Sequence, residues 1–260
     1  MPFRESAGIR YLQFESLQLP ALQHAILTRR GGVSPRPWAS LNLGGTVGDD
    51  PDRVGANLQR AMEATGLRSG SLFQVWQVHS KEVARADGPQ PDRSSIKADA
   101  IVTNRTGVTL LMRFADCVPI LIFDPVRSAI GMAHAGWLGT VRGVATALVR
   151  NMTREFGSEP GDLLAALGPS IGPDHYPVGP EVAAQVESSF GPAAPEHLRK
   201  QNGSLIFDLW SANRWQLESG GIRSVEVSGI CTACHLNDWY SHRGEHGQTG
   251  RFGAVIALSF

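Results

Sequence analysis

The clearest hydrophobic pattern lies in the middle of the chain, where two short apolar runs follow each other closely. Val118–Phe123 is wholly apolar, and Ala129–His134 is apolar up to its final histidine, which is typical of strands that are buried on both faces. The segment 125–128 between them is short enough for a hairpin. We therefore expect these two strands to pair in antiparallel fashion.

A helical pattern begins at Asp50 and Pro51, because aspartate caps a helix well and proline suits its first position. Apolar residues then recur at helical spacing from Val54 to Leu67. Further helices are predicted over 138–155, ending at Gly157, over 181–190 and over 209–218, whereas 191–203 is predicted to be a loop.

Other short runs rich in apolar and β-branched residues predict further strands along the chain. Strands and helices are intermixed, many neighbouring strands should be antiparallel, and no change of composition marks a linker. This pattern favours one α/β domain with large mixed or antiparallel sheets over a doubly wound Rossmann fold. The predicted strands cover 25–29, 72–79, 82–86, 100–103, 108–113, 163–167, 225–229 and 254–260.

Composition narrows the class of protein further. The chain has 260 residues, of which 42% are hydrophobic, and its 24 basic and 24 acidic residues leave no formal net charge. This balance argues against general disorder, a nucleic-acid coat and an anionic-membrane binder. The first 20 residues lack the apolar core of a signal peptide, so we expect a soluble cytoplasmic protein whose three cysteines stay reduced.

Three residues predicted to lie at strand ends could carry chemistry. They are His79, Cys117 and His134. Two imidazoles and a thiolate suit Zn²⁺, and also copper, and three protein ligands would leave a fourth position open, as in catalytic zinc sites. A Cys–His nucleophile without metal is an equal alternative, and packing in the core is the ordinary role of such residues.

A second cysteine motif lies near the end of the chain. Cys231–His235 matches the C-x-x-C-H pattern of haem attachment, but haem attachment normally requires export. A structural zinc would need a further ligand, for which His242 or His246 could serve. A reduced cysteine pair with no ligand is the simplest alternative.

The motifs taken together resemble the YfiH-like family, also called laccase-domain proteins, polyphenol oxidases, peptidoglycan editing factors and purine nucleoside phosphorylases. The resemblance extends from about Leu27 to Leu258, so a single domain over 1–260 is expected. The motifs that carry it are Thr28–Ser34, Ser40–Gly44, Gln77–His79, Ala98–Ala100, Ala115–Pro119, His134–Trp137, Gly168–Gly172, Ser241–Arg243 and Thr249–Arg251.

The resemblance implies a four-layer α/β/β/α sandwich with mixed, largely antiparallel sheets. It also implies that His79, Cys117 and His134 hold a catalytic zinc, because these residues match the family's ligand positions. The implied activity is phosphorolysis of purine nucleosides, namely adenosine, inosine, guanosine and methylthioadenosine, with accompanying deamination of adenosine. Small-molecule substrates are therefore expected, without nucleic-acid or membrane partners.

Phosphorolysis needs groups that bind phosphate and the nucleoside. Arg29 and Arg243 are candidates for phosphate, since arginine can bind it in a bidentate manner. Asn42 and Gln77 could hydrogen-bond the sugar or base, and Asp116 is either a proton shuttle or a support for neighbouring groups. For the two tryptophans that flank the ligands, Trp76 and Trp137, we expect core packing rather than purine stacking.

Two other activities assigned to the family remain as alternatives. One is a hydrolase or amidase that edits peptidoglycan precursors. The other is copper-dependent oxidation of phenols, although eight histidines in the whole chain are too few for a conventional multicopper set. Copper in the His–Cys–His site would be the simpler origin of such an activity, because Cu²⁺ competes effectively with Zn²⁺ for these ligands.

Overall fold

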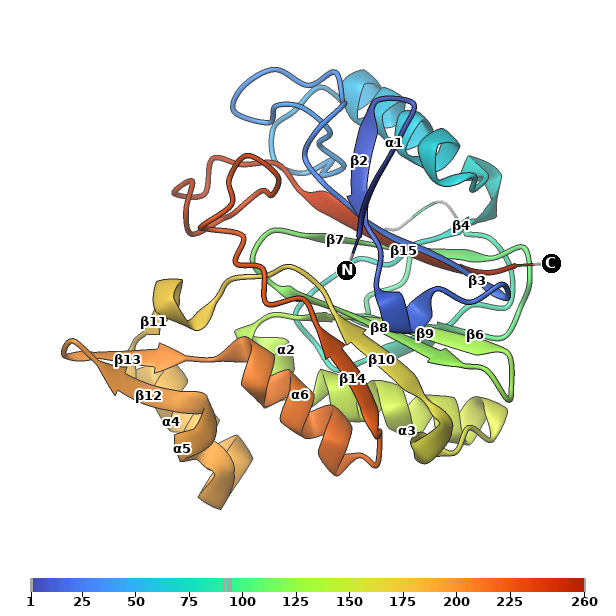
Figure 1. Ribbon diagram of the computed structural model, residues 1–260. Coiled ribbons are helices and arrows are strands. Elements are labelled where there is room, and N and C mark those ends of the chain that lie inside the picture. Colours follow the sequence, from blue (N-terminus) through green and yellow to red (C-terminus); the bar gives the residue numbers. More distant parts are fainter. Residues whose placement is uncertain (1, 91, 93–94, 260) are drawn as a thin grey trace.

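Two six-stranded sheets face each other at the centre of the molecule (Figure 1). The computed structural model describes residues 2–90, 92 and 95–259. The first sheet has the order β1 (Phe3–Ser6), β2 (Ile9–Leu12), β3 (Leu22–Leu27), β15 (Phe252–Leu258), β7 (Thr109–Phe114), β4 (Leu72–Phe73). The second has the order β14 (Ser224–Val227), β10 (Leu164–Leu167), β8 (Val118–Asp124), β9 (Ala129–Ala135), β6 (Ala100–Thr103), β5 (Val83–Arg85).

Helices cover the outer faces of both sheets, which gives four layers. Helix α1 (Pro51–Thr65) packs through Ala61 and Met62 on the first sheet. Apolar residues of α3 (Val144–Phe156) and α6 (Leu209–Ser219) pack on the second sheet. A third cluster, which includes Phe114, Leu121 and Met132, fills the space between the sheets. The predicted α/β/β/α sandwich is therefore confirmed.

The central hairpin shows why the middle of the chain is so apolar. All seven residues of β8 and all seven of β9 are buried, because one face of these strands meets the other sheet and the opposite face meets helices. They pair antiparallel as expected, with Val118 opposite Ala135. Most of the other pairings are also antiparallel, but β10 and β14, β5 and β6, and β4 and β7 are parallel pairs.

The remaining elements form a smaller unit beside the second sheet. It contains a three-stranded sheet with the order β11 (Pro177–Val178), β13 (Ser204–Phe207), β12 (Leu198–Gln201). Helices α4 (Pro180–Phe190) and α5 (Ala194–His197) lie next to it (Figure 1). The expectation of a loop over 191–203 is therefore wrong, because α5 and β12 occupy much of this segment.

Two further expectations are corrected. The segment 72–79 is a strand only over Leu72–Phe73, and His79 lies in a loop with a φ of 57°. The expected helix over 138–155 is two helices, α2 (Trp137–Val141) and α3, because Gly143 between them has a φ of 81°.

The expected helix start at Asp50 is confirmed, since its carboxylate accepts the Asp52 N–H at 2.8 Å. The last strand ends at Leu258, and Phe260 lies outside the described residues.

The described part of the chain contains no helix that combines the length and the apolar character needed to cross a membrane.

A buried histidine in the first sheet makes stability depend on pH. His24 on β3 is buried, and its Nε2 accepts a hydrogen bond from the Phe14 N–H at 2.8 Å. Burial lowers the pKa of His24 to about 4, although the charge of Glu226 opposes this shift. The unfolded chain, with a histidine pKa of about 6.5, therefore binds more protons between these two values.

Stability should accordingly fall as the pH decreases from about 6.5 toward about 4. The shift corresponds to a contribution of up to about 3 kcal/mol from this one residue. Urea unfolding of wild type and His24→Gln at pH 7, 5 and 4 measures it, and the variant should lose less stability on acidification. Equal pH dependence in the two proteins would contradict the assignment.

Candidate active site

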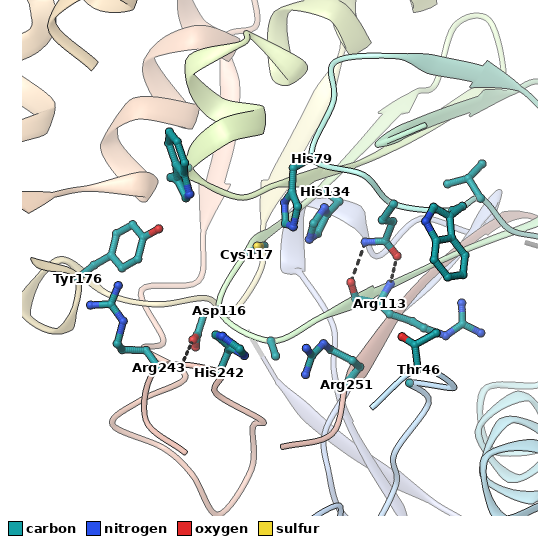
Figure 2. Close-up of a pocket in the computed structure, with 16 residues that line it drawn as sticks. Thr46, His79, Arg113, Asp116, Cys117, His134, Tyr176, His242, Arg243 and Arg251 are labelled. Atoms are coloured by element: carbon teal, nitrogen blue, oxygen red, sulfur yellow. Dashed lines mark hydrogen bonds between the residues drawn. The ribbon is translucent and has the colours of Figure 1, made fainter. Parts of the chain in front are cut away.

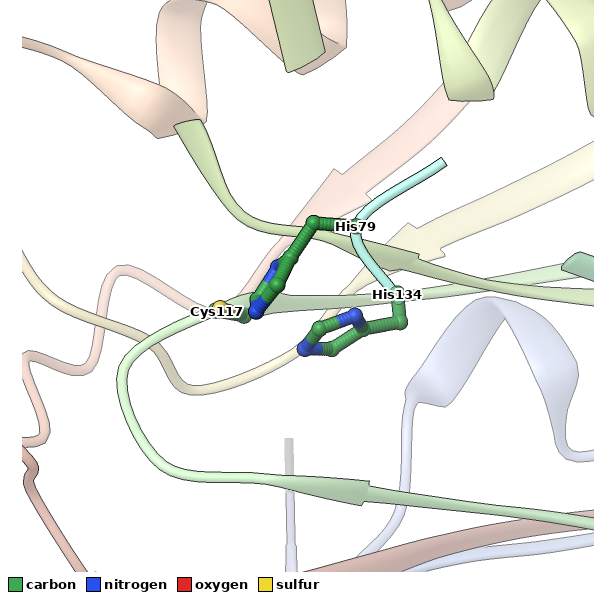
Figure 3. A group of neighbouring side chains, drawn as sticks. All are labelled: His79, Cys117 and His134. Atoms are coloured by element: carbon green, nitrogen blue, oxygen red, sulfur yellow. The ribbon is translucent and has the colours of Figure 1, made fainter. Parts of the chain in front are cut away.

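The side chains of His79, Cys117 and His134 converge at one end of the central hairpin (Figure 3). Their candidate ligand atoms all lie within 4.8 Å of one another, and the two imidazole rings are 4.9 Å apart between centroids. His134 is buried, Cys117 is half-buried and His79 is exposed. The three residues therefore form a group that is open to solvent on one side.

Each of the three residues is positioned by a different backbone feature. Cys117 immediately precedes β8, and the preceding Asp116 takes the positive φ of 82° that turns the chain out of β7. His134 lies on β9, where it is opposite Pro119. His79 does not end a strand, and its loop is held by other contacts.

Asp99 joins the His79 loop to His134. Its Oδ1 lies 2.9 Å from His134 Nδ1, which leaves Nε2 of His134 as the other ring nitrogen. Its Oδ2 accepts the Val78 N–H at 3.0 Å, the Ser80 N–H at 2.6 Å and the Ser80 hydroxyl at 2.9 Å. Asp99 is fully buried, so one carboxylate orients two of the three candidate ligands. Asp99 lies in a motif noted above, but the sequence did not indicate this role.

The electrostatics favour a thiolate at Cys117. Burial raises the pKa of the Cys117 thiol, but the charge and hydrogen bond of His134, followed by those of His79, lower it to about 6. Burial lowers the pKa of His134, whereas Cys117 and Asp99 raise it to about 9. Hydrogen bonds from His134 and the amides of Ser80 and Val78 outweigh burial and hold the pKa of Asp99 below its usual range.

The donor set and the space around it fit a metal ion such as zinc. Two imidazoles and a thiolate are the ligands that Zn²⁺ prefers, and the open side provides a fourth position. Gly136 keeps that space clear, because a Cβ there would lie 2.7 Å from Cys117 Sγ and 3.1 Å from His79 Nδ1. A glycine at position 136, two residues after His134, is thus a steric requirement of the group.

The three residues open into a cavity of about 490 Å³. Figure 2 shows Tyr176 and Arg243 on one side of the metal-ligand group and Thr46, Arg113 and Arg251 on the other. A cavity of this size accommodates a small organic substrate. The other lining residues are Gly44, Val75, Trp76, Gln77, Ala115, Asp116, Trp137 and His242.

Three arginines give the cavity positive charge. Arg113 on β7 donates to the Gln74 side chain at 2.6 Å and to the Leu43 carbonyl. Arg251 donates to the Gly250 carbonyl at 2.8 Å; burial lowers its pKa, and the charges of Cys117 and Asp116 oppose that shift. Arg243 lies over the Tyr176 ring at 5.0 Å. Of these three, only Arg243 was a candidate from the sequence.

Asp116 supports the loops around the cavity. Its Oδ1 accepts the hydroxyls of Thr232 and Ser241, each at 2.7 Å, and its Oδ2 accepts the Arg243 N–H at 2.6 Å. Three donors thus use the carboxylate, which favours the supporting role over the proton shuttle.

The other sequence candidates lie in different places. Arg29 does not line the cavity; its guanidinium pairs with Glu245 at 2.9 Å and stacks over Tyr240. Asn42 is fully buried and donates to Asp49 at 2.8 Å, also away from the cavity lining. Both residues therefore brace loops instead of facing substrate.

Gln77 does line the cavity, but its amide group is paired with the backbone of Arg113. It donates to the Arg113 carbonyl at 2.8 Å and accepts the Arg113 N–H at 3.0 Å. Trp76 is 38% exposed and lines the cavity, so the expectation that it packs in the core is wrong. Trp137 lines the cavity and also packs against the core.

Removing the charge of Asp99 should weaken metal binding. In Asp99→Asn, the side chain keeps only one oxygen, so its NH2 group would face either the donors now bonded to Oδ2 or His134 Nδ1. The interaction with His134 Nδ1 would also lose the negative charge of the carboxylate. Changes of this kind next to metal ligands typically cost about 10- to 100-fold in affinity. Competition with a chelator of known affinity measures the loss for zinc.

The matched control is Asp124→Asn. Asp124 is also a fully buried carboxylate, but it caps the turn after β8 through the Val126 and Arg127 N–H groups. It should leave zinc affinity unchanged. Equal zinc affinity in the Asp99 variant and wild type would refute the role of Asp99.

Comparison with known proteins identifies similar chains. Residues 23–259 match the family described as multi-copper polyphenol oxidoreductase laccase. A purine nucleoside phosphorylase of Deinococcus radiodurans is 39% identical over 251 residues, which cover 96% of this chain and 94% of that protein. The purine nucleoside phosphorylase YlmD of Bacillus subtilis is 35% identical, covering 89% of this chain and 86% of that protein.

Two crystal structures share the fold over nearly their whole length. YfiH of Bacillus licheniformis superposes with a TM-score of 0.92 at 31% identity, and YlmD of Geobacillus stearothermophilus with 0.91 at 32%. In both cases 99% of this chain and 99% of the other chain are covered.

Proposed function

Since this chain belongs to the multi-copper polyphenol oxidoreductase laccase family, the YfiH-like family that its motifs resemble, we propose that it is a metal-dependent purine nucleoside phosphorylase. The substrates would be adenosine, inosine, guanosine and methylthioadenosine, which phosphate would split into a free base and a sugar 1-phosphate. The observation that carries the proposal is one cavity that combines a His–Cys–His group with three arginines. Similarity to relatives named purine nucleoside phosphorylase supports it.

The arginines would bind phosphate. Arg113, Arg243 and Arg251 present guanidinium groups to the same cavity, and arginine matches the geometry of phosphate oxygens. Phosphate held there could attack the anomeric carbon of the sugar, and the electron pair of the glycosidic bond would leave with the base. We thus propose that Arg113 and Arg251, in place of Arg29, bind phosphate together with Arg243.

Aromatic side chains would hold the base. Trp76 and Tyr176 line the cavity, and purines stack well on such rings. His242 lines the same cavity without belonging to the His–Cys–His group, so its imidazole is available to exchange a proton with the departing base.

His79, Cys117 and His134 would hold the metal, which we propose to be zinc, with copper as an alternative occupant of the same site. When bound, zinc supplies Lewis acidity and lowers the pKa of coordinated water to about 7. Adenosine deamination would require water to displace the amino group from its purine carbon, in the cavity beside the His–Cys–His group. The chain's part in both reactions is to hold the purine against the open side of the metal site.

A laccase-like oxidation receives less support from the ligand sets. Among the described residues, the two groups that could hold a metal each provide three ligands, fewer than a conventional multicopper set requires. Hydrolysis of peptidoglycan precursors remains the other activity to test, because a metal-activated water could also attack a carbonyl.

The proposal is tested with protein stripped of metal and then reconstituted with zinc. Each of the four nucleosides is incubated with and without phosphate, and the bases are separated by chromatography. Phosphate-dependent release of base supports the proposal. Release that is independent of phosphate, or no release from zinc-loaded protein, would refute it and make amino-acid release from muropeptides the next assay.

Arg251→Met should raise the KM for phosphate. Loss of a hydrogen bond between charged groups costs about 1.5–3 kcal/mol, which corresponds to about 10- to 100-fold. Initial rates at varied phosphate and saturating inosine measure the effect. Arg30→Met is the control, because Arg30 pairs with Asp238 at 2.8 Å outside the cavity lining. An unchanged KM in the Arg251 variant would remove this residue from the phosphate site.

A further inference from the structure

The cysteine pair near the end of the chain meets a histidine from a distant turn. Cys231 and Cys234 lie in the segment after β14, and His175 lies in the turn Pro173–His175 before β11. His175 Nδ1 is 3.5 Å from Cys234 Sγ and 3.8 Å from Cys231 Sγ. The candidate ligand atoms of the three residues lie within 4.8 Å of one another.

These separations match those of ligands around one zinc ion. Zinc binds sulfur at about 2.3 Å and imidazole nitrogen at about 2.0–2.1 Å, which places tetrahedral S and N ligands about 3.6 Å apart. The two observed S···N distances bracket that value. Two cysteines separated by two residues are also a common part of zinc sites, and two cysteines with one histidine bind zinc with the fourth position open.

The backbone at Gly172 lies close to the side chain of Cys231. The Gly172 N–H donates to Cys231 Sγ at 3.2 Å, which holds the sulfur next to this turn. A Cβ at Gly172 would lie 3.1 Å from Cys231 Cβ and 3.3 Å from its Sγ. Cys234 and His175 are exposed, so an ion could reach the site and bind a water or a carboxylate as fourth ligand.

The other histidines near the pair point elsewhere. His235 Nδ1 lies 2.9 Å from the Cys231 carbonyl oxygen. His242 lines the catalytic cavity, and neither it nor His246 belongs to the cysteine group. The ligand expected from the sequence at His242 or His246 is therefore replaced by His175, which no motif singled out.

We propose that His175, Cys231 and Cys234 bind a second Zn²⁺ ion, separate from the ion at the catalytic site. The ion joins the turn that precedes Tyr176 to the segment that continues toward Arg243. Thr232, next to Cys231, donates to Asp116, which also accepts the Arg243 N–H. The second ion therefore stabilises the part of the cavity wall that contains Arg243 and Tyr176, where the guanidinium lies over the ring. Its binding does not depend on which reaction the cavity catalyses.

Zinc stoichiometry tests the proposal directly. Metal-free protein is loaded with zinc in the presence of a phosphine reductant, desalted and analysed by mass spectrometry of the metal. We expect two zinc ions per wild-type chain, one in Cys234→Ala, one in Cys117→Ala and none in the double variant. His235→Ala is the matched control and should retain two.

Spectroscopy with Co²⁺ shows which ligands are involved. Wild type should give thiolate-to-cobalt absorption from both sites, and Cys117→Ala should retain the absorption of the second site alone. His175→Ala in the Cys117→Ala background should abolish high-affinity binding and leave the Tm unresponsive to zinc. One zinc ion per wild-type chain, or two in the folded Cys234→Ala variant, would overturn the proposal.

Discussion

Replacing Cys117 by alanine is expected to abolish both phosphorolysis and tight zinc binding at the group formed by His79, Cys117 and His134. The thiolate is one of the three proposed protein ligands, and its charge balances that of the buried His134 imidazole in the metal-free protein. Mutation of a residue that only hydrogen-bonds a metal ligand lowers metal affinity by up to about 100-fold. Removal of a ligand itself should therefore lower zinc affinity by more than about 100-fold. Base release from inosine should fall at least as far.

The measurement pairs zinc analysis with initial rates at saturating phosphate. Val118→Ala is the matched control, because Val118 is the fully buried neighbour of Cys117 on β8. That variant should lose about 2 kcal/mol or more of stability while keeping its zinc. If Cys117→Ala keeps as much zinc as wild type and remains active, the assignment of His79, Cys117 and His134 as metal ligands is wrong.

A single methyl group added at Gly136 should also weaken zinc binding. The new Cβ would lie 2.7 Å from Cys117 Sγ and 3.1 Å from His79 Nδ1, closer than van der Waals contact. Without metal these side chains can rotate away, so the protein should still fold. With metal bound they cannot move without leaving the ion, and zinc affinity should therefore fall by at least about 10-fold, as for changes beside metal ligands.

Gly55→Ala is the control for a glycine-to-alanine change. Gly55 lies in α1, and a Cβ there has no atom within 4 Å. The change should stabilise the helix by up to about 1 kcal/mol and leave zinc binding unaltered. Titration of both metal-free variants against a chromophoric chelator measures the difference. Wild-type affinity in Gly136→Ala would show that the ligands do not surround the ion as inferred.

The central elements were predictable because local and tertiary preferences agree there. Val118–Asp124 and Ala129–Ala135 are buried on both faces, so each had to be almost entirely apolar, and the start of α1 carries its cap in the sequence at Asp50. The segment 72–79 was predicted less well. Its apolar residues line the core and the cavity, but Asp99 accepts the Val78 and Ser80 N–H groups that a strand would have used.

The proposed metal ligands stand out from the sequence by their residue types and motifs, whereas the roles of the residues around them do not. Asp99 and Arg251 act through spatial contacts that no local pattern encodes. Arg29 was a phosphate candidate because it lies beside a glycine-rich loop, but its guanidinium forms a salt bridge with Glu245. His175 is a lone histidine 56 residues from Cys231, so only the fold could bring it to the cysteines.

The most direct test of the account is the identity of the sugar product. Zinc-loaded protein is incubated with inosine and phosphate, hypoxanthine is measured by chromatography, and the sugar is followed by ³¹P NMR, with Cys117→Ala as the control. We expect equal amounts of hypoxanthine and ribose 1-phosphate, and neither product from the control. Free ribose, no hypoxanthine, or the same products from the control would contradict it.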